Sequence, residues 1–133
     1  MGHSTSVSTA VISATGFNAP GSLTQGVESW DGTSWTEKNN VNTARYYVGG
    51  AGTQASMIIF GGYFPPTRTN IVEQWNGTSW TEVADLTQSK YGVGGCGTFA
   101  SALAAAGALV PGSTTECEEW SGAPVAVHTV TTS

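Results

Sequence analysis

The chain has 133 residues, only 10% of them charged, and a formal net charge of −5 at pH 7. Its four basic residues, Lys38, Arg45, Arg68 and Lys90, are scattered along the sequence, whereas nucleic acids and anionic membranes bind clustered Lys and Arg. The composition therefore excludes nucleic acid and membrane as expected partners, and the length fits a single domain.

No targeting segment is visible in the sequence. The N-terminus has neither a basic region nor a long apolar region, as a signal peptide requires. The longest apolar run, residues 99–110, is too short to span a bilayer.

The predicted elements recur with a period of 45 residues. Trp30, Trp75 and Trp120 lie at this spacing within VESWDGTSWTE, VEQWNGTSWTE and CEEWSG, and residues 24–68 match 69–113 at 20 of 45 positions. A fixed period of 40 to 50 residues is typical of a repeat architecture. We expect one repeat domain over 1–133, divided into units at about 1–45, 46–90 and 91–133.

In the first unit, residues 3–9 take the place of the glycine-containing first strand of the second unit. Asp31-Gly32 marks a hairpin in the first unit. In the second unit we expect strands over 46–52, 55–62, 70–75 and 78–83. Residues 63–69 are predicted to be a loop, because two prolines cannot sit inside a ladder. Asn76-Gly77 predicts a two-residue hairpin turn with positive φ at both positions.

In the third unit Ser121-Gly122 marks the hairpin, and residues 101–110 pose a conflict. Their alanine-rich sequence favours a helix, whereas the repeat aligns them with the apolar strand of the second unit. We predict a strand, because a helix would break the repeat.

The residues that could support chemistry are few. Cys96 and Cys117 align with Ala51 and Val72, so we expect small buried side chains, with a disulfide left open. His3 and His128 have no nearby Cys, Asp or His at ligand spacing. We therefore expect no catalytic residue, no metal site and no cofactor.

Acidic residues form two columns in the repeat: Glu28, Glu73 and Glu118, and Glu37 with Glu82. Paired carboxylates can act in acid–base catalysis. Identical residues in successive repeats more often have one structural role each. We expect these carboxylates to accept hydrogen bonds from backbone amides or threonine hydroxyls in an adjacent turn.

The order Arg45, a short apolar strand, Gly61-Gly62, Trp75 and then Trp80 resembles the kelch motif. The resemblance implies an all-β, kelch-like β-propeller with three four-stranded blades in this chain. The W-D/N-G-T-S-W-T-E form is also similar to repeats of marine phage and environmental bacterial proteins. That similarity favours a virion or extracellular location.

Propellers have about four to eight blades around a closed ring. Three blades alone would leave two apolar faces in water, whereas two chains would give six blades. We therefore expect a homodimer whose second chain completes the ring.

The expected function is a non-catalytic binding or structural module, with a glycan or a protein as ligand. Loops on a rigid scaffold tend to carry binding residues, and this places the candidate ligand contacts at Arg45, Tyr46, Tyr63, Phe64, Arg68, Lys90 and Tyr91. Structural roles are expected for Trp30, Trp35, Trp75, Trp80, Trp120, Gly61 and Gly62. Two alternatives remain: a kelch-type protein-interaction scaffold, and a fragment of a longer or engineered propeller.

Overall fold

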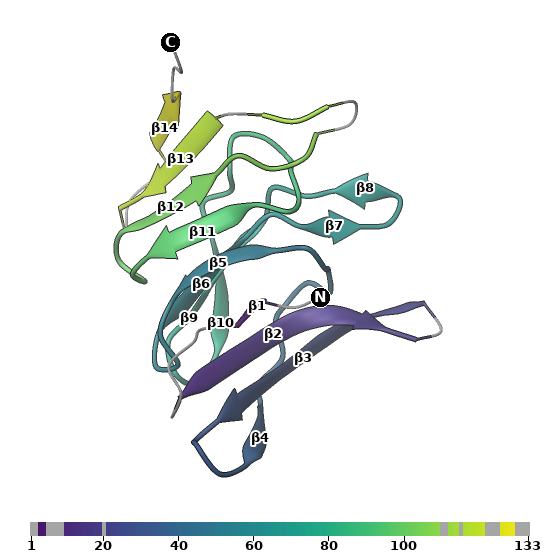
Figure 1. The fold of residues 1–133 in the computed structure, drawn as a ribbon, viewed down its shortest axis with the longest axis vertical. Helices are drawn as coiled ribbons and strands as arrows, with labels where there is room; N and C mark the ends of the chain where they lie inside the picture. Colours follow the sequence, from purple (N-terminus) through teal and green to yellow (C-terminus); the bar gives the residue numbers. More distant parts are fainter. Residues whose placement is uncertain are drawn as a thin grey trace.

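The computed structural model describes residues 3–4, 10–19, 21–109, 112–114, 116–121 and 126–129, with backbone alone for 3–4 and 126–129. These residues form an all-β structure of three four-stranded antiparallel sheets and one two-stranded sheet (Figure 1). Among them no helix is long and apolar enough to cross a membrane.

Each large sheet takes its strands from one 45-residue unit, with neighbours in chain order. Sheet I contains β1 (His3–Ser4), β2 (Val11–Asn18), β3 (Ser22–Trp30) and β4 (Trp35–Lys38). Sheet II contains β5 (Gly49–Gly52), β6 (Met57–Phe60), β9 (Val72–Trp75) and β10 (Trp80–Val83). Sheet III contains β11 (Gly94–Gly97), β12 (Ala102–Ala105), β13 (Glu116–Trp120) and β14 (Ala126–Thr129). The small sheet is the hairpin of β7 (Tyr63–Phe64) and β8 (Thr67–Arg68).

Two apolar clusters hold the three sheets together, with sheet II in the middle (Figure 1). One cluster joins Ile12 and Val27 of sheet I to Ile59 of sheet II. The other joins Phe60 of sheet II to Trp120 of sheet III. All four residues of β6 are buried, as expected for a strand covered on both faces. Among the described residues, sheets I and III are each covered on one face only.

Sheet I departs from the repeat by one residue. In sheet II, Trp75 pairs with Met57, which the 45-residue period aligns with Ile12. In sheet I, however, Trp30 pairs with Val11, one residue earlier. Because side chains alternate between faces, a one-residue shift moves a strand's apolar set to the opposite face. The shift places Ile12 and Ala14 in the core with sheet II. The outer face of sheet I therefore carries fewer apolar side chains than the repeat alone predicts.

The loop predicted over 63–69 is wrong, since β7 and β8 pair there. The ladder joins Tyr63 to Arg68 and Phe64 to Thr67. The two prolines occupy the tip between the strands, where no ladder N–H is required of them. The hairpin projects to the same side as the β2–β3 turn (Figure 1).

The predicted two-residue turn at Asn76-Gly77 is also wrong. Trp75 pairs with Trp80, so the loop has four residues, 76–79. Only Gly77 has positive φ, at 97°. The Asn76 side chain closes the loop by accepting hydrogen bonds from two following backbone amides.

Asp31 makes the same turn in sheet I. Its Oδ1 accepts hydrogen bonds from the amides of Thr33 and Ser34, each at 2.8 Å. Hydrogen bonds from the Ser34 and Thr33 backbone lower the pKa of Asp31 below its usual 3.8, because they stabilise the ionised carboxylate.

The strand prediction over 101–110 is confirmed in part, since Ala102–Ala105 form β12 between β11 and β13. The prediction for the cysteines holds for Cys117, which is buried, but is wrong for Cys96, which is exposed. The physical reason is position: Ala51, the equivalent of Cys96, is buried against sheet III. No described sheet lies over Cys96, and both thiols are free.

Candidate functional site

Five aromatic rings gather at one place in the fold. They come from β2, from the segment before β5, from β7 and from the segment before β11. Tyr46 contacts Phe17, Tyr47 and Tyr63, with ring centroids 5.3, 4.6 and 5.4 Å apart. Tyr91 contacts Tyr47 at 6.1 Å and Tyr63 at 5.5 Å. These tilted and edge-on arrangements are the ones aromatic pairs prefer. We call Phe17, Tyr46, Tyr47, Tyr63 and Tyr91 the aromatic cluster.

The backbone fixes the cluster in place. Tyr46 and Tyr63 exchange two backbone hydrogen bonds, of 3.1 and 2.7 Å, which tie the start of β7 to the segment before β5. Gly62 allows this approach: a Cβ there would lie 2.9 Å from Val48 Cγ1 and 3.0 Å from the Tyr46 carbonyl oxygen. Tyr91 occupies the same repeat position as Tyr46, one unit further on.

The cluster is partly open to solvent. Phe17 and Tyr47 are 51% and 46% exposed, and Tyr46, Tyr63 and Tyr91 are half-buried. Burial, with a smaller contribution from neighbouring tyrosines led by Tyr63, raises the pKa of Tyr46 above its usual 10.0. Its hydroxyl therefore stays protonated at neutral pH and can both donate and accept hydrogen bonds.

A hollow of about 440 Å³ adjoins the cluster at Tyr63, and Pro66, Thr67, Arg68 and Ser89 complete its lining. Arg68 donates from Nε to the Ser89 carbonyl oxygen at 2.8 Å. This bond anchors the β7–β8 hairpin to the segment before sheet III.

Phe64 lies on the same hairpin but outside the ring contacts of the cluster. It is 47% exposed and lines a second hollow of about 320 Å³, which shares Thr67, Arg68 and Ser89 with the first. Of the predicted ligand contacts, the structure thus brings together Tyr46, Tyr63 and Tyr91 and places Arg68 beside them.

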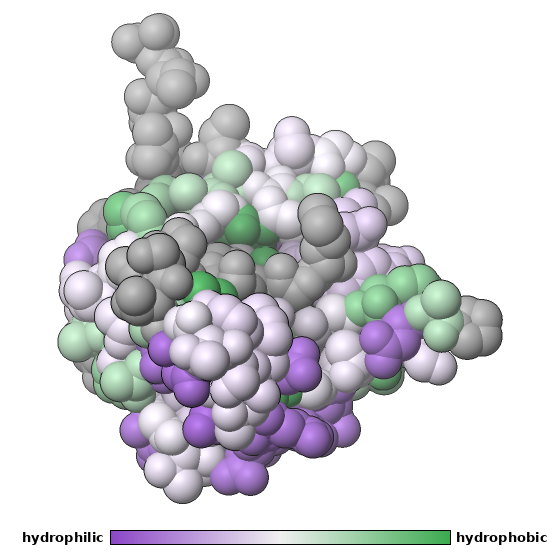
Figure 2. All heavy atoms as spheres, turned by 60° about the horizontal axis from the view of Figure 1, so that its bottom comes forward, coloured by the Kyte–Doolittle hydropathy of each residue, from purple (hydrophilic) through white to green (hydrophobic). Residues whose placement is uncertain are grey.

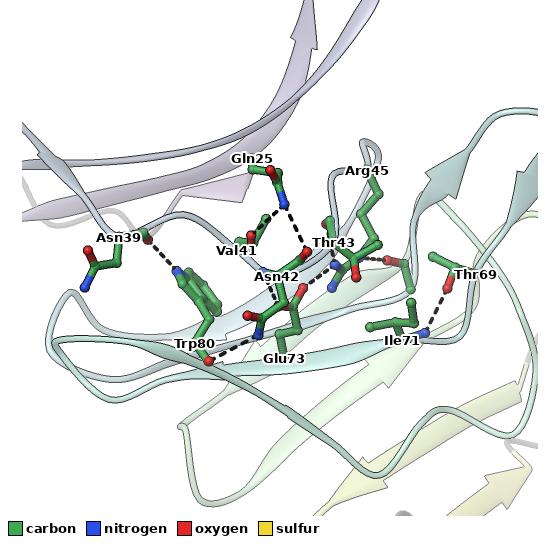
Figure 3. Close-up of polar contacts among 11 residues, drawn as sticks. Gln25, Asn39, Val41, Asn42, Thr43, Arg45, Thr69, Ile71, Glu73 and Trp80 are labelled. Carbon is green, nitrogen blue, oxygen red and sulfur yellow. Dashed lines mark hydrogen bonds and ion pairs between the residues drawn. The ribbon is translucent and has the colours of Figure 1, made fainter.

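Arg45 and Lys90 correct the sequence prediction, because neither reaches the surface. Both side chains are 0% exposed and form ion pairs with Glu73 and Glu118 respectively. Arg45 also donates from Nε to the Gly61 carbonyl oxygen at 2.7 Å and from Nη1 to that of Thr43 at 2.9 Å (Figure 3). Both cations are buried and paired with a carboxylate, so they stabilise the packing of the sheets and are not available to a ligand.

The acidic column behaves as predicted in sheets II and III. Glu73 accepts a hydrogen bond from the Asn42 amide at 2.7 Å. Glu118 accepts from the amide and hydroxyl of Thr87 at 2.6 and 2.8 Å, and its other oxygen lies 2.7 Å from Lys90 Nζ. The carboxylates thus bind the segments that connect one sheet to the next, whereas Glu28 is exposed.

The residues predicted to be structural differ in burial. Trp75, Trp80 and Trp120 are buried, as are Gly61 and Gly62, whereas Trp30 is half-buried and Trp35 is 52% exposed. The indole of Trp80 donates to the Asn39 carbonyl oxygen at 3.1 Å (Figure 3). Trp35, its equivalent, lies on the uncovered face of sheet I.

Sequence reasoning missed two members of the cluster, Tyr47 and Phe17. Tyr47 could have been suspected from its place beside Tyr46, although its equivalent in the next unit is Gly92. Phe17 gave no signal, because it lies where β2 and β3 extend beyond the strands of the other units. Among the described residues there is also no group of three or more His, Cys, Asp or Glu side chains that could hold a metal ion.

No family model and no curated protein matches the chain. The solved structure of YjhT is similar in fold, with a TM-score of 0.73 over 90% of this chain, at 17% sequence identity. This chain spans 42% of the length of the YjhT chain, so the matched structure continues well beyond these three sheets.

Proposed function

We propose that this chain is a non-catalytic binding module made of three kelch-like propeller blades, which are sheets I, II and III. We further propose that its aromatic cluster and the adjoining hollow bind a carbohydrate. The observation that supports the proposal is the cluster itself. Four tyrosines and a phenylalanine hold one another at centroid distances of 4.6 to 6.1 Å and remain partly exposed.

The chemistry of the cluster suits a sugar. A tyrosine ring offers an apolar face and a hydroxyl at its edge, so one side chain can contact both the C–H and the O–H groups of a pyranose. Binding sites commonly combine aromatic walls with a few placed polar groups. Here Arg68, Thr67 and Ser89 supply those groups at the rim of the hollow.

Rigidity supports the same proposal. Each tyrosine has few rotatable bonds, and backbone pairing between Tyr46 and Tyr63 holds two of the rings before any ligand arrives. Pre-ordered side chains lose less entropy on binding, and this favours affinity for a weakly held ligand such as a glycan.

The test is a glycan array followed by calorimetric titration of the best glycan. Tyr47→Ala should weaken binding at least tenfold, because it removes the most exposed tyrosine of the cluster. Phe64→Ala is the matched control, since Phe64 is equally exposed but outside the ring contacts. An array without any reproducible glycan, or equal losses for the two variants, would refute the proposal.

A second use, docking of a protein partner, is the kelch-type scaffold alternative. It is favoured by the uncovered outer face of sheet I, where Trp35 is exposed. Cross-linking from Lys38, an exposed lysine at the other end of β4, followed by mass spectrometry would detect such a partner. A virion-associated role is proposed on the sequence resemblance alone, and detection of the protein in purified virions would test it.

A further inference from the structure

The β7–β8 hairpin carries one aromatic side chain on each of its faces. Tyr63 and Phe64 are neighbours on β7, and successive side chains of a strand point to opposite faces. Tyr63 lines the hollow of about 440 Å³, and Phe64 lines the hollow of about 320 Å³. The two linings share Thr67, Arg68 and Ser89, so the hollows adjoin each other along the hairpin. A ligand that fills the first hollow and continues past the hairpin therefore enters the second.

The second hollow combines apolar and neutral polar side chains. Phe64 and Ile71 are its apolar members, and Thr43, Thr69 and Asn70 supply hydroxyl and amide groups. Among the residues that the structure describes, no Asp or Glu lines either hollow. Hydroxyl and amide groups both donate and accept hydrogen bonds, as the hydroxyl groups of a neutral sugar do. The ring of Phe64, nearly half exposed, adds an apolar face for the C–H groups of such a sugar.

Hydrogen bonds hold the walls of the second hollow in place. The carbonyl oxygen of Thr43 accepts from Nη1 of the buried Arg45 at 2.9 Å (Figure 3). Asn70 donates from Nδ2 to the Leu86 carbonyl oxygen at 3.1 Å, and its own carbonyl oxygen accepts from the Leu86 amide at 2.9 Å. Walls that are fixed in advance lose little entropy when a ligand binds. Arg45, although it is not available to a ligand itself, therefore fixes one wall of this hollow.

We propose that the two hollows are consecutive subsites for an oligosaccharide that crosses the β7–β8 hairpin, and that Phe64 determines specificity at the second subsite. The inference rests on the proposed function, because the first sugar unit is the one held at the aromatic cluster. Both hollows lie toward the lower end of the roughly 300–1,000 Å³ typical of small-ligand pockets. Each therefore suits one sugar unit, and the length of the glycan decides how many subsites are filled.

The test is a chain-length series measured by calorimetric titration. The probes are the glycan that the array selects and its fragments of one, two and three sugar units. Wild-type affinity should rise about fivefold from the monosaccharide to the trisaccharide, because the second subsite adds aromatic and hydrogen-bond contacts. Phe64→Ala should remove this gain and leave the affinity for the monosaccharide unchanged, so it remains a control for the first subsite. Tyr47→Ala, in contrast, should lower the affinity for every fragment.

Trp35→Ala is the matched control for Phe64→Ala. Trp35 is an aromatic residue of similar exposure, 52% against 47%, but it is not among the residues that line either hollow. It belongs to β4 at the lower end of Figure 1, and Figure 2, which brings that end forward, shows mainly hydrophilic and intermediate residues there. Trp35→Ala should therefore bind every fragment as the wild type does.

Circular dichroism of the variants checks that they are folded, as expected for substitutions at exposed positions. Equal wild-type affinity for all fragments would overturn the two-subsite arrangement and leave glycan binding itself intact. The same holds if Phe64→Ala weakens the monosaccharide as much as the trisaccharide, or if Trp35→Ala loses as much as Phe64→Ala. An array without any glycan would overturn both proposals, so the two failures are distinguishable.

Discussion

Replacing Arg45 tests whether the buried ion pairs hold the sheets together. Arg45 and Glu73 are both 0% exposed, so removing one partner leaves the other charged in an apolar setting. Breaking a buried pair in this way costs about 3–5 kcal/mol. We therefore expect Arg45→Met to lower the free energy of unfolding by about that amount, a large share of the roughly 5–15 kcal/mol typical of a domain.

Arg45→Lys provides the sharper comparison, because the next repeat already uses Lys90 at this position. The ammonium keeps the ion pair but loses the two carbonyl contacts of the guanidinium, to Gly61 and Thr43. Two lost hydrogen bonds at about 1 kcal/mol each predict a cost of about 2 kcal/mol. Arg45→Lys should thus fall between the wild type and Arg45→Met.

Urea unfolding followed by tryptophan fluorescence measures both variants. A fall in the midpoint at unchanged slope reports lost stability without a change in the unfolded state. A cost below 1 kcal/mol for Arg45→Met would refute the reasoning, since the pair would then contribute little. Equal costs for the Lys and Met variants would show that the carbonyl contacts, and not the charge, are what matters.

Gly95→Ala should destabilise the chain by about 1–3 kcal/mol, because the added Cβ would lie 2.3 Å from a backbone oxygen of sheet II. Gly94→Ala is the control in the same urea assay. Its Cβ would lie 3.6 Å from the nearest atom, so stability should change by about 0.5 kcal/mol or less. At pH values above its unfolded pKa, the ionised Asp31 carboxylate stabilises the folded chain, and this contribution is lost as the pH falls through its lowered folded pKa. Asp31→Asn should therefore remove this acid dependence from urea midpoints measured down to pH 2. Cys96 should react with a thiol reagent in the native protein and Cys117 only after unfolding. A stopped-flow measurement of the number of thiols that react before and after unfolding checks this.

Much of the candidate site was predictable from the sequence, but its members were grouped wrongly. The sequence predicts Tyr46, Tyr63 and Tyr91 as ligand contacts because they lie on loops or corners of the scaffold, and the structure brings their rings together. Arg45 and Lys90 were selected for the same reason, yet they are buried. Their sequence neighbours carry no sign of this, because the partner carboxylates lie 28 residues further along the chain and on another sheet.

The sequence by itself determined the repeat, the all-β class and the acceptor role of Glu73 and Glu118, because a 45-residue period and a strand alternation are local properties of the chain. Only the tertiary structure decided which equivalent positions are covered. Trp80 is buried and Trp35 exposed although the surrounding sequences are nearly the same, because burial depends on whether a neighbouring sheet lies over the face. The one-residue register of β2 was decided in the same way, since it puts Ile12 under sheet II.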